Sequence, residues 1–302
     1  MLAPSPILTV TVEHEDAEPE LHLQPGGQGF WVARMIRALE VTVAFCAPLG
    51  GKIGTVLRAL IESEQLDLIA VETSGWNGAY VHDRHRAGLV DVARIGSPRL
   101  MRHETDALYA AMVSASLEAD LAVLTGSGED EAFDPDFYRR LASDLRGNGG
   151  RVLADLSGPP LAAALAGGIE VLHVSERELR EHTRAPLEGP AEIATAMERL
   201  REQGADYPIV SRGPETALVL LDDGVKEVVG PVFDARQPRG AGDSMFGAIA
   251  ASLARGQPIE RALQLGVAAG ALNAVRRGLG SGNKDDIERL APKVKLRPLD
   301  RG

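Results

Sequence analysis

The sequence predicts one α/β domain, a three-layer α/β/α sandwich around a mainly parallel central sheet. Short β-branched runs alternate with helical patterns of about ten to fifteen residues, which is typical of βαβ units. The strand runs are almost continuously apolar, as expected for strands buried on both faces. The 302 residues contain no repeat and no linker between two full domains, so residues 1–302 are predicted to form a single domain.

The predicted elements follow one another in a regular order. Runs rich in Val, Ile and Leu mark strands, and apolar residues three or four positions apart mark helices. The strands of the alternating part are Ile7–Val12, Val41–Ala47, Leu66–Glu72, Ala119–Gly126, Arg151–Ser157 and Ile169–Ser175. The helices are Gly29–Leu39, Gly51–Glu64, Glu104–Glu118, Asp134–Gly147 and Pro159–Gly168.

The alternation breaks in two places. Thr73–Gly96 alternates polar and apolar residues and predicts antiparallel strands, which together with 12–26 are expected to form a reduced β lid. Tyr207–Pro231 predicts three strands joined by turns at 212–214 and 222–224. The last third is predicted to be helical, over Asp243–Arg255, Ile259–Arg277 and Lys284–Leu290.

Composition and charge exclude several classes of protein. The net charge of −11 repels nucleic acid and anionic membranes, so neither is expected as a partner. The single cysteine, Cys46, lies in an apolar run and is expected to be a buried thiol. No run approaches the roughly 18 apolar residues of a membrane span, and no signal peptide is recognised, so a cytoplasmic location is expected.

A glycine-rich turn opens the helix that begins near Asp243. Gly240, Ala241, Gly242 and Asp243 stand where the backbone N–H groups of a helix lack intrahelical partners and carry partial positive charge. Such a turn is suited to bind phosphate. Asp243 is interpreted either as a plain helix cap or as a base that accepts a proton from an attacking hydroxyl.

A second glycine-rich helix opening occurs at Pro25–Arg34, far from the first. Two such openings indicate two ligand-binding ends. Neither has the spacing of a Walker A loop, and neither is a dinucleotide-binding fingerprint directly after the first strand.

The chain resembles the PfkB, ribokinase-like, family of carbohydrate kinases, within it the branch of 1-phosphofructokinase and tagatose-6-phosphate kinase. The strongest match is RGAGDSMFGAIAASLARG, which resembles the second signature of the family. PGGQGFWVARMIRAL resembles the first signature, and HVSERELRE stands where Lys-Pro-Asn-x-x-Glu is usual. Weaker matches, in chain order, are ILTVT for the opening strand, PLGGKIG, VLTGSGEDEAFDPDFYRRL and the nucleotide segment IVSRGPETALVLL.

The resemblance implies transfer of the γ-phosphoryl group of ATP to a sugar hydroxyl, with Mg²⁺. Asp243 would be the base, and the amides of Ala241, Gly242 and Asp243 would form the anion hole, opened by Gly240. Glu178 would help to hold hydrated Mg²⁺, the alternative being a solvated helix charge. Ser211 and Gly213 would lie along the nucleotide, and Asn273 near the adenine. The sugar side would comprise Asp16, Gly26, Gly27, Gln28, Trp31 and Ser127.

Several positions depart from the family pattern, mostly at the acceptor end. Gln28 stands where the branch has Lys, and Trp31 where the family has a sugar-binding Asn. Residues 13–17 replace the usual Asn-Pro-Ala-Leu-Asp, with Asp16 as a substitute for its aspartate. Further departures are Gly75 and Trp76 at an expected arginine, Ser175 at the Asn of the metal motif, and Arg239 before the anion hole.

These departures leave two readings of the acceptor site open. Trp31 and Trp76 are either half-buried core aromatics or a platform for a less polar acceptor. Arg94, Arg99 and Arg102 either supply a substitute phosphate site or belong to a solvated surface.

We therefore carry three functional hypotheses forward. The first is an ATP-dependent kinase of a sugar or sugar phosphate. The second is a non-catalytic relative that binds a nucleotide or metabolite, and the third is a nucleoside or vitamin kinase of the same fold. A homodimer is one option, because related kinases often dimerise through the lid, but the reduced lid predicted here argues against that route.

Overall fold

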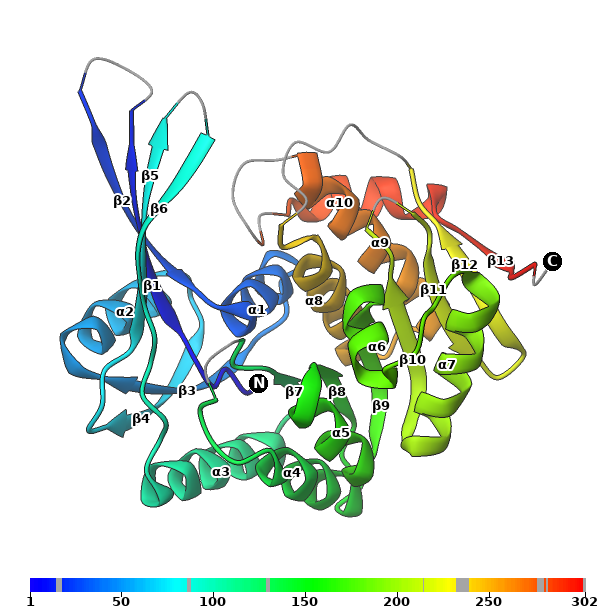
Figure 1. Cartoon of the computed structure of the whole chain (residues 1–302), viewed down its shortest axis with the longest axis horizontal. Helices are drawn as coiled ribbons and strands as arrows, with labels where there is room; N and C mark the ends of the chain where they lie inside the picture. Colours follow the sequence, from blue (N-terminus) through cyan, green and yellow to red (C-terminus); the bar gives the residue numbers. More distant parts are fainter. Residues whose placement is uncertain are drawn as a thin grey trace.

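The computed structural model describes residues 1–14, 18–85, 88–128, 131–213, 215–231, 239–275, 280 and 282–300. Its central sheet lies between two layers of helices, and a separate sheet projects from one end of the body (Figure 1). No helix in these ranges is long and apolar enough to cross a membrane.

The central sheet is parallel in its middle and antiparallel at one edge. Its seven-stranded part has the order β13-β12-β11-β10-β9-β8-β7. The pairs from β7 to β10 are parallel, and those from β10 to β13 are antiparallel. The bounds are β7 Ala122–Thr125, β8 Val152–Asp155, β9 Ile169–Ser175, β10 Ala205–Ser211, β11 Ala217–Leu221, β12 Gly224–Val229 and β13 Lys295–Pro298.

The first residues of the chain complete this sheet. Leu2 forms parallel bridges both to Leu124 in β7 and to Cys46 in β3, Ala44–Gly50. The Leu2 N–H donates to the carbonyl of Val123 at 2.8 Å. Beyond β3 lies β4, Asp67–Thr73, paired in parallel. Cys46 is fully buried here, as expected from its apolar run.

Helices cover both faces of the sheet because its side chains alternate between two cores. Val123, Leu153 and Val171 point into the core beneath one helix layer, whereas their neighbours Leu124 and Ala154 point into the other. The first layer contains α1 Gln28–Ala38, α2 Gly51–Ser63, α8 Ala241–Ala254, α9 Ile259–Val275 and α10 Lys284–Leu290. The second contains α3 Arg102–Ser116, α4 Asp136–Gly147, α5 Gly158–Gly167, α6 Glu176–Thr183 and α7 Pro190–Gln203.

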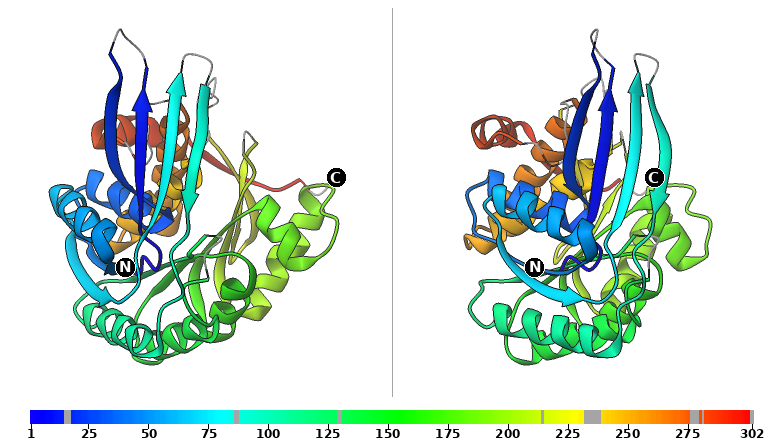
Figure 2. Two further views of the ribbon diagram at one scale, coloured as in Figure 1. Left: turned by 60° about the vertical axis from the view of Figure 1, so that its left-hand side comes forward. Right: turned by 90° about the vertical axis from the view of Figure 1, so that its left-hand side faces the viewer.

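The second sheet, which we call the lid, has the order β2-β1-β5-β6 (Figure 2). Its strands are β1 Ile7–Glu13, β2 Glu20–Gly26, β5 Gly78–His85 and β6 Gly88–Ile95. The run Ile7–Val12 was predicted as the opening strand of the central sheet, and that assignment is wrong. Leu2 occupies that place, and β1 pairs with β2 and β5 instead.

Buried Asn77 fastens the base of the lid to the central sheet. Its side-chain oxygen accepts from the Gly50 N–H at 2.9 Å, and its amide nitrogen donates to the carbonyls of Pro6 and Pro48 at 3.1 and 3.0 Å. A buried amide with this many partners fixes the relative position of its neighbours. The lid is therefore anchored beside the carboxyl end of β3.

Candidate active site

Three polar side chains meet where neighbouring parallel strands end. Asp155 ends β8, His173 lies near the end of β9, and Ser211 ends β10. Asp155 Oδ2 lies 3.1 Å from His173 Nδ1, and His173 Nε2 lies 3.1 Å from Ser211 Oγ. Asp155 and His173 are each 4% exposed. The carboxyl edge of a parallel sheet is the usual ligand-binding edge of an α/β fold.

The glycine-rich turn begins α8 directly beside this group. Gly240 has φ 76°, a conformation that favours glycine, and its carbonyl accepts the first helical bond from Ser244 N–H at 3.0 Å. Within the described ranges, the amides of Ala241, Gly242 and Asp243 have no acceptor. They are therefore available to an anion, as the sequence predicts.

Gly242 lies against His173. A Cβ on Gly242 would lie 3.2 Å from His173 Cε1, so a side chain at this position would crowd the imidazole. From the other side, α9 packs against the turn so closely that a Cβ on Gly270 would lie 2.9 Å from the Ala241 carbonyl oxygen. The turn that carries these amides is thus held between β9 and α9.

The environment of Asp243 suits a general base. Burial, reinforced by the negative charge of Asp155 and Glu178 and partly offset by His173, raises the pKa of Asp243 from 3.8 to about 7. A base whose pKa lies near neutral pH combines a usable ionised fraction with real proton affinity. The residue as a whole is partly buried, whereas its carboxyl group lies in buried surroundings. The N-cap position of α8 is Gly240, which has no side chain, so the choice between a base and a plain cap for Asp243 stays a prediction.

His173 is a site residue that the sequence analysis missed. Burial alone disfavours its charged form, but the carboxylates of Asp155, Glu178 and Asp243 outweigh this and raise the pKa of His173. Its ring also stacks on Phe246 of α8, with centroids 5.9 Å apart. The available signal was its place in HVSERELRE, where the family usually has Lys, because an imidazolium there also supplies a cation.

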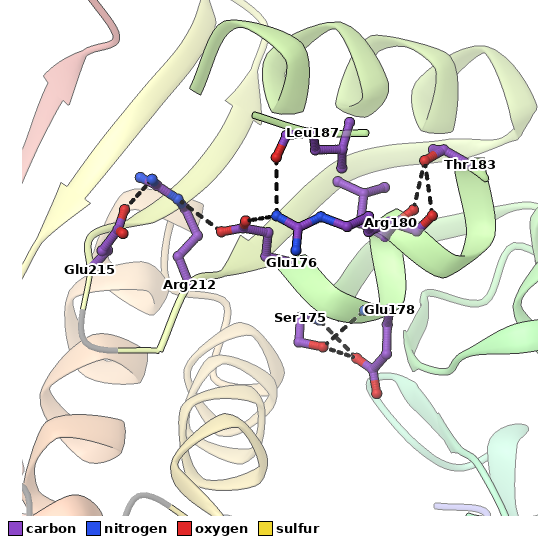
Figure 3. Close-up of polar contacts among 9 residues, drawn as sticks. Ser175, Glu176, Glu178, Arg180, Thr183, Leu187, Arg212 and Glu215 are labelled. Carbon is purple, nitrogen blue, oxygen red and sulfur yellow. Dashed lines mark hydrogen bonds and ion pairs between the residues drawn. The ribbon is translucent and has the colours of Figure 1, made fainter. Parts of the chain in front are cut away.

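Glu178 lies at the start of α6, where it completes a capping box (Figure 3). Its Oε2 accepts from the Ser175 N–H at 2.8 Å and from Ser175 Oγ at 2.7 Å, while Ser175 Oγ accepts from the Glu178 N–H. Arg177 lies 3.6 Å from the other oxygen, Oε1. Glu178 is therefore a cap as well as a metal candidate, and one of its oxygens is already used.

The turn that follows β10 is fixed by a row of ion pairs (Figure 3). The Arg212 side chain is 9% exposed and lies between Glu215 and Glu176, with its Nε 3.4 Å from Glu176 Oε2. Arg180 continues the row, since it lies 2.5 Å from Glu176 and donates to the Leu187 carbonyl at 3.0 Å. These contacts tie the turn after β10, which carries Ser211 and Gly213, to the first turn of α6.

Gly213 and Asn273 occupy different surroundings. Gly213 has φ 62°, and a Cβ there would meet nothing within 4 Å, so the turn presents open backbone. Asn273 is 1% exposed. Its amide nitrogen donates to the Arg239 carbonyl at 3.0 Å, and its oxygen accepts from the Gly280 N–H at 3.1 Å. The structure thus shows Asn273 bracing the loop before α8, and its proximity to adenine stays a prediction.

The first glycine-rich opening packs against the start of the chain and the end of β7. A Cβ on Gly27, whose φ is 98°, would lie 2.8 Å from the Ser5 carbonyl oxygen, and one on Gly26 would lie 2.7 Å from Thr9 Oγ1. Gln28 Oε1 accepts from the Gly126 N–H at 2.9 Å, next to Ser127. Gly26, Gly27, Gln28 and Ser127 are therefore brought together.

Trp31 and Asp16, two further residues predicted on the acceptor side, are not placed by the structure beside the Gly26–Gln28 turn as ligand contacts. Trp31 is 8% exposed and packs edge-on against Phe30 in the core, which is the core alternative. Asp16 lies outside the described residues. Its assignment assumed that Ile7–Val12 opens the central sheet, and this basis is removed because β1 belongs to the lid.

A cavity of about 200 Å³ lies at the base of the lid, next to Ser5, the residue that Gly27 packs against. It is lined by Ser5, Trp76, Arg99 and the buried Glu104, among others. Trp76 is 55% exposed, and its indole N–H donates to the Gly96 carbonyl at 3.2 Å. Arg94 instead stacks over Tyr80, and Arg102 is exposed beside Asp106. Of the three arginines considered for a substitute phosphate site, Arg99 is the one that lines this cavity.

Fold and site together indicate a class: an α/β phosphotransferase, with helix N-terminal amides beside a carboxylate and a cavity at the base of a lid. The protein-family model described as pfkB family carbohydrate kinase matches residues 6–286. The chain belongs to this family, and it is an ATP-dependent carbohydrate kinase. The predicted resemblance and fold class are thereby confirmed.

Named relatives and solved structures agree with this assignment. The chain is 28% identical over 269 residues to the ATP-dependent 6-phosphofructokinase isozyme 2 of Escherichia coli, covering 88% of this chain and 87% of that protein. It is 26% identical to the 1-phosphofructokinase of Bacillus subtilis, over 91% and 89% of the two chains. The E. coli phosphofructokinase-2 crystal structure with potassium superposes with a TM-score of 0.86 at 27% identity, over 96% and 97%.

Proposed function

We propose that the chain transfers the γ-phosphoryl group of Mg²⁺-bound ATP to a hydroxyl of a sugar phosphate of the fructose phosphate type. The observation that carries this proposal is the placement of three groups at one strand edge: Asp243, His173 and the first α8 amides, which have no acceptor among the residues that the structure describes. The relatives named as phosphofructokinases support the acceptor class.

Each group has a distinct task in this reaction. Asp243 accepts the proton of the attacking hydroxyl, which increases the nucleophilicity of its oxygen. The amides of Ala241, Gly242 and Asp243 stabilise charge that develops on the phosphoryl oxygens. His173, held by Asp155, adds positive charge beside the same amides. Ser211 and Gly213, braced by the Arg212 ion pairs, border the nucleotide.

The donor set fits a hydrated Mg²⁺ better than a directly caged one. Mg²⁺ prefers oxygen ligands and usually keeps several waters. Asp243 and Glu178 supply carboxylates close enough that each affects the other electrostatically, but one oxygen of Glu178 already serves the capping box. Glu178 would therefore hold the ion through water. When bound, Mg²⁺ neutralises phosphate charge.

The acceptor would extend from the turn at Gly26–Gln28 towards the cavity at the base of the lid. Arg99 is a cation that lines this cavity and offers a counter-charge for a phosphate. The half-exposed face of Trp76 favours a second candidate acceptor that is flatter and less polar, such as a nucleoside.

One assay separates these possibilities. ADP release is measured with fructose 6-phosphate, fructose 1-phosphate, tagatose 6-phosphate, free fructose and a set of nucleosides, each with Mg²⁺ and ATP. We expect a sugar phosphate to give the highest kcat/KM, and Arg99→Ala to raise KM for that acceptor selectively. A nucleoside preference would support the Trp76 alternative. ATP binding without turnover on any acceptor would support a non-catalytic relative.

We also propose that two copies associate through the lid. Leu21 and Leu23 on β2 and Val90 on β6 are 64%, 43% and 55% exposed. Exposed apolar rows on a sheet commonly mark an interface, and an E. coli relative has been solved in a tetrameric form. Leu21→Lys should shift the protein towards monomer in analytical ultracentrifugation, and an unchanged sedimentation coefficient would contradict the proposal.

A further inference from the structure

The free end of the lid carries a cluster of two histidines and an aspartate away from the strand edge described above. His14 directly follows β1, and Asp83 and His85 lie at the end of β5. β1 and β5 pair in parallel, with Val12 opposite Asp83, and the His14 N–H donates to the Arg84 carbonyl at 3.0 Å. Because side chains alternate along a strand, all three residues project from one face.

The ligating atoms of these residues converge. His14 Nε2 lies 3.1 Å from Asp83 Oδ1, and His85 Nε2 lies 3.1 Å from Asp83 Oδ2. The two imidazoles stack with centroids 4.6 Å apart. One donor atom from each residue lies within 4.8 Å of the other two.

From this geometry we propose that His14, Asp83 and His85 bind a divalent transition metal ion of the zinc type. Ligands on tetrahedral Zn²⁺ at about 2.0–2.2 Å lie roughly 3.3 Å from one another, so small side-chain rotations would close the site. Two imidazoles and one carboxylate suit Zn²⁺ or Co²⁺ far better than Mg²⁺, which prefers oxygen. The side chains are 37%, 32% and 50% exposed, which leaves room for a water as fourth ligand.

The ion would link the two lid strands that carry these side chains. A metal ion accepts both neutral nitrogens and keeps the carboxylate paired. It would fasten the ends of β1 and β5, next to the pair that Arg84 and Glu13 already form at 3.0 Å.

The test is calorimetric and spectroscopic titration of the full chain. Metal-free protein is titrated with Zn²⁺ and with Co²⁺ in excess Mg²⁺, and we expect one ion per chain with the intense visible absorption of tetrahedral Co²⁺. Asp83→Asn and His85→Gln should each weaken binding by about tenfold or more. His182→Gln is the matched control, because His182 lies on α6, bonded to Gln203.

The outcomes are decisive because kinase activity with Mg²⁺ and ATP is measured separately as a check of folding. No saturable binding by active protein would overturn the proposal, as would binding that survives both lid variants or that millimolar Mg²⁺ abolishes. Loss of binding in His182→Gln alone would place the ion elsewhere and also overturn it.

Discussion

Asp243→Asn tests the proposed chemistry and the electrostatics of the strand edge at the same time. The substitution keeps the size of the side chain but removes its negative charge and its ability to accept a proton. A general base contributes about 10²–10⁴ to the rate. We therefore expect kcat to fall at least a hundredfold, with a smaller change in KM for ATP.

The same substitution should stabilise the unliganded protein at alkaline pH. The folded chain holds the Asp243 proton more tightly than the unfolded chain, since the pKa rises from 3.8 to about 7. The contribution of this proton to the free energy of unfolding is fully present below pH 3.8. It decreases as the pH rises from 3.8 and is lost once the pH has passed through 7. The carboxylate then costs at most about 4 kcal/mol at pH 8. Asparagine removes this cost.

The measurements are steady-state turnover between pH 5.5 and 9 and urea unfolding at pH 5 and pH 8. In the parent, kcat/KM should rise with pH around 7, as Asp243 ionises in the free enzyme. Asp285→Asn is the matched control, because Asp285 is an exposed aspartate in the first turn of α10. A turnover within tenfold of the parent, or an Asp243→Asn protein less stable than the parent at pH 8, would refute the reasoning.

Three further variants test how the site is held. His173→Ala should lower the free energy of unfolding by about 3–5 kcal/mol, because Asp155 is left buried without its counter-charge. Thermal unfolding measures this loss. If stability recovers in the double variant Asp155→Asn/His173→Ala, the unpaired carboxylate is the cause. Gly242→Ala should change the free energy of unfolding by no more than about 1 kcal/mol, because alanine is a better helix former than glycine. The variant should still reduce kcat, because the new Cβ would lie 3.2 Å from His173 Cε1 and crowd the imidazole. A kcat equal to that of the parent would contradict the role of that contact. Arg212→Ala should raise KM for ATP several-fold more than KM for the acceptor, because the turn that carries Gly213 loses its ion pairs with Glu176 and Glu215. Initial-rate assays measure both constants. Equal increases in the two KM values would show that the turn does not border the nucleotide.

Local patterns identified most elements, but not which sheet each strand joins. The run Ile7–Val12 has the composition of a strand, and it is one. Its sheet depends on pairing with residues near positions 20–26 and 78–85, which no local pattern records. The residues that lie between β7 and β3 in the central sheet, around Leu2, are too few to show a period. Strands β11 and β12 were predicted correctly because turn residues and alternating runs are both local signals.

The same distinction explains the site. The turn at Gly240–Asp243 was predictable because an anion-binding helix terminus is built from consecutive residues. The group of Asp155, His173 and Ser211 was not, since it forms only when three strands separated by crossovers lie side by side. Trp31 shows that a local motif can also mislead. Its position in the first signature predicted a ligand contact, whereas its packing against Phe30 places it in the core.

The charges at the strand edge explain why His173 is buried there. Asp155 and His173 are both almost fully buried, and a buried carboxylate without a partner is costly. His173 lies 3.1 Å from Asp155 Oδ2 through Nδ1, contacts Ser211 through Nε2 and still lies against Gly242, and the nearby carboxylates favour its charged form because they raise its pKa. Charge on a phosphoryl group at the α8 amides would therefore meet a cation whose orientation is already fixed. That preorganisation, rather than flexibility, is what the structure offers to phosphoryl transfer.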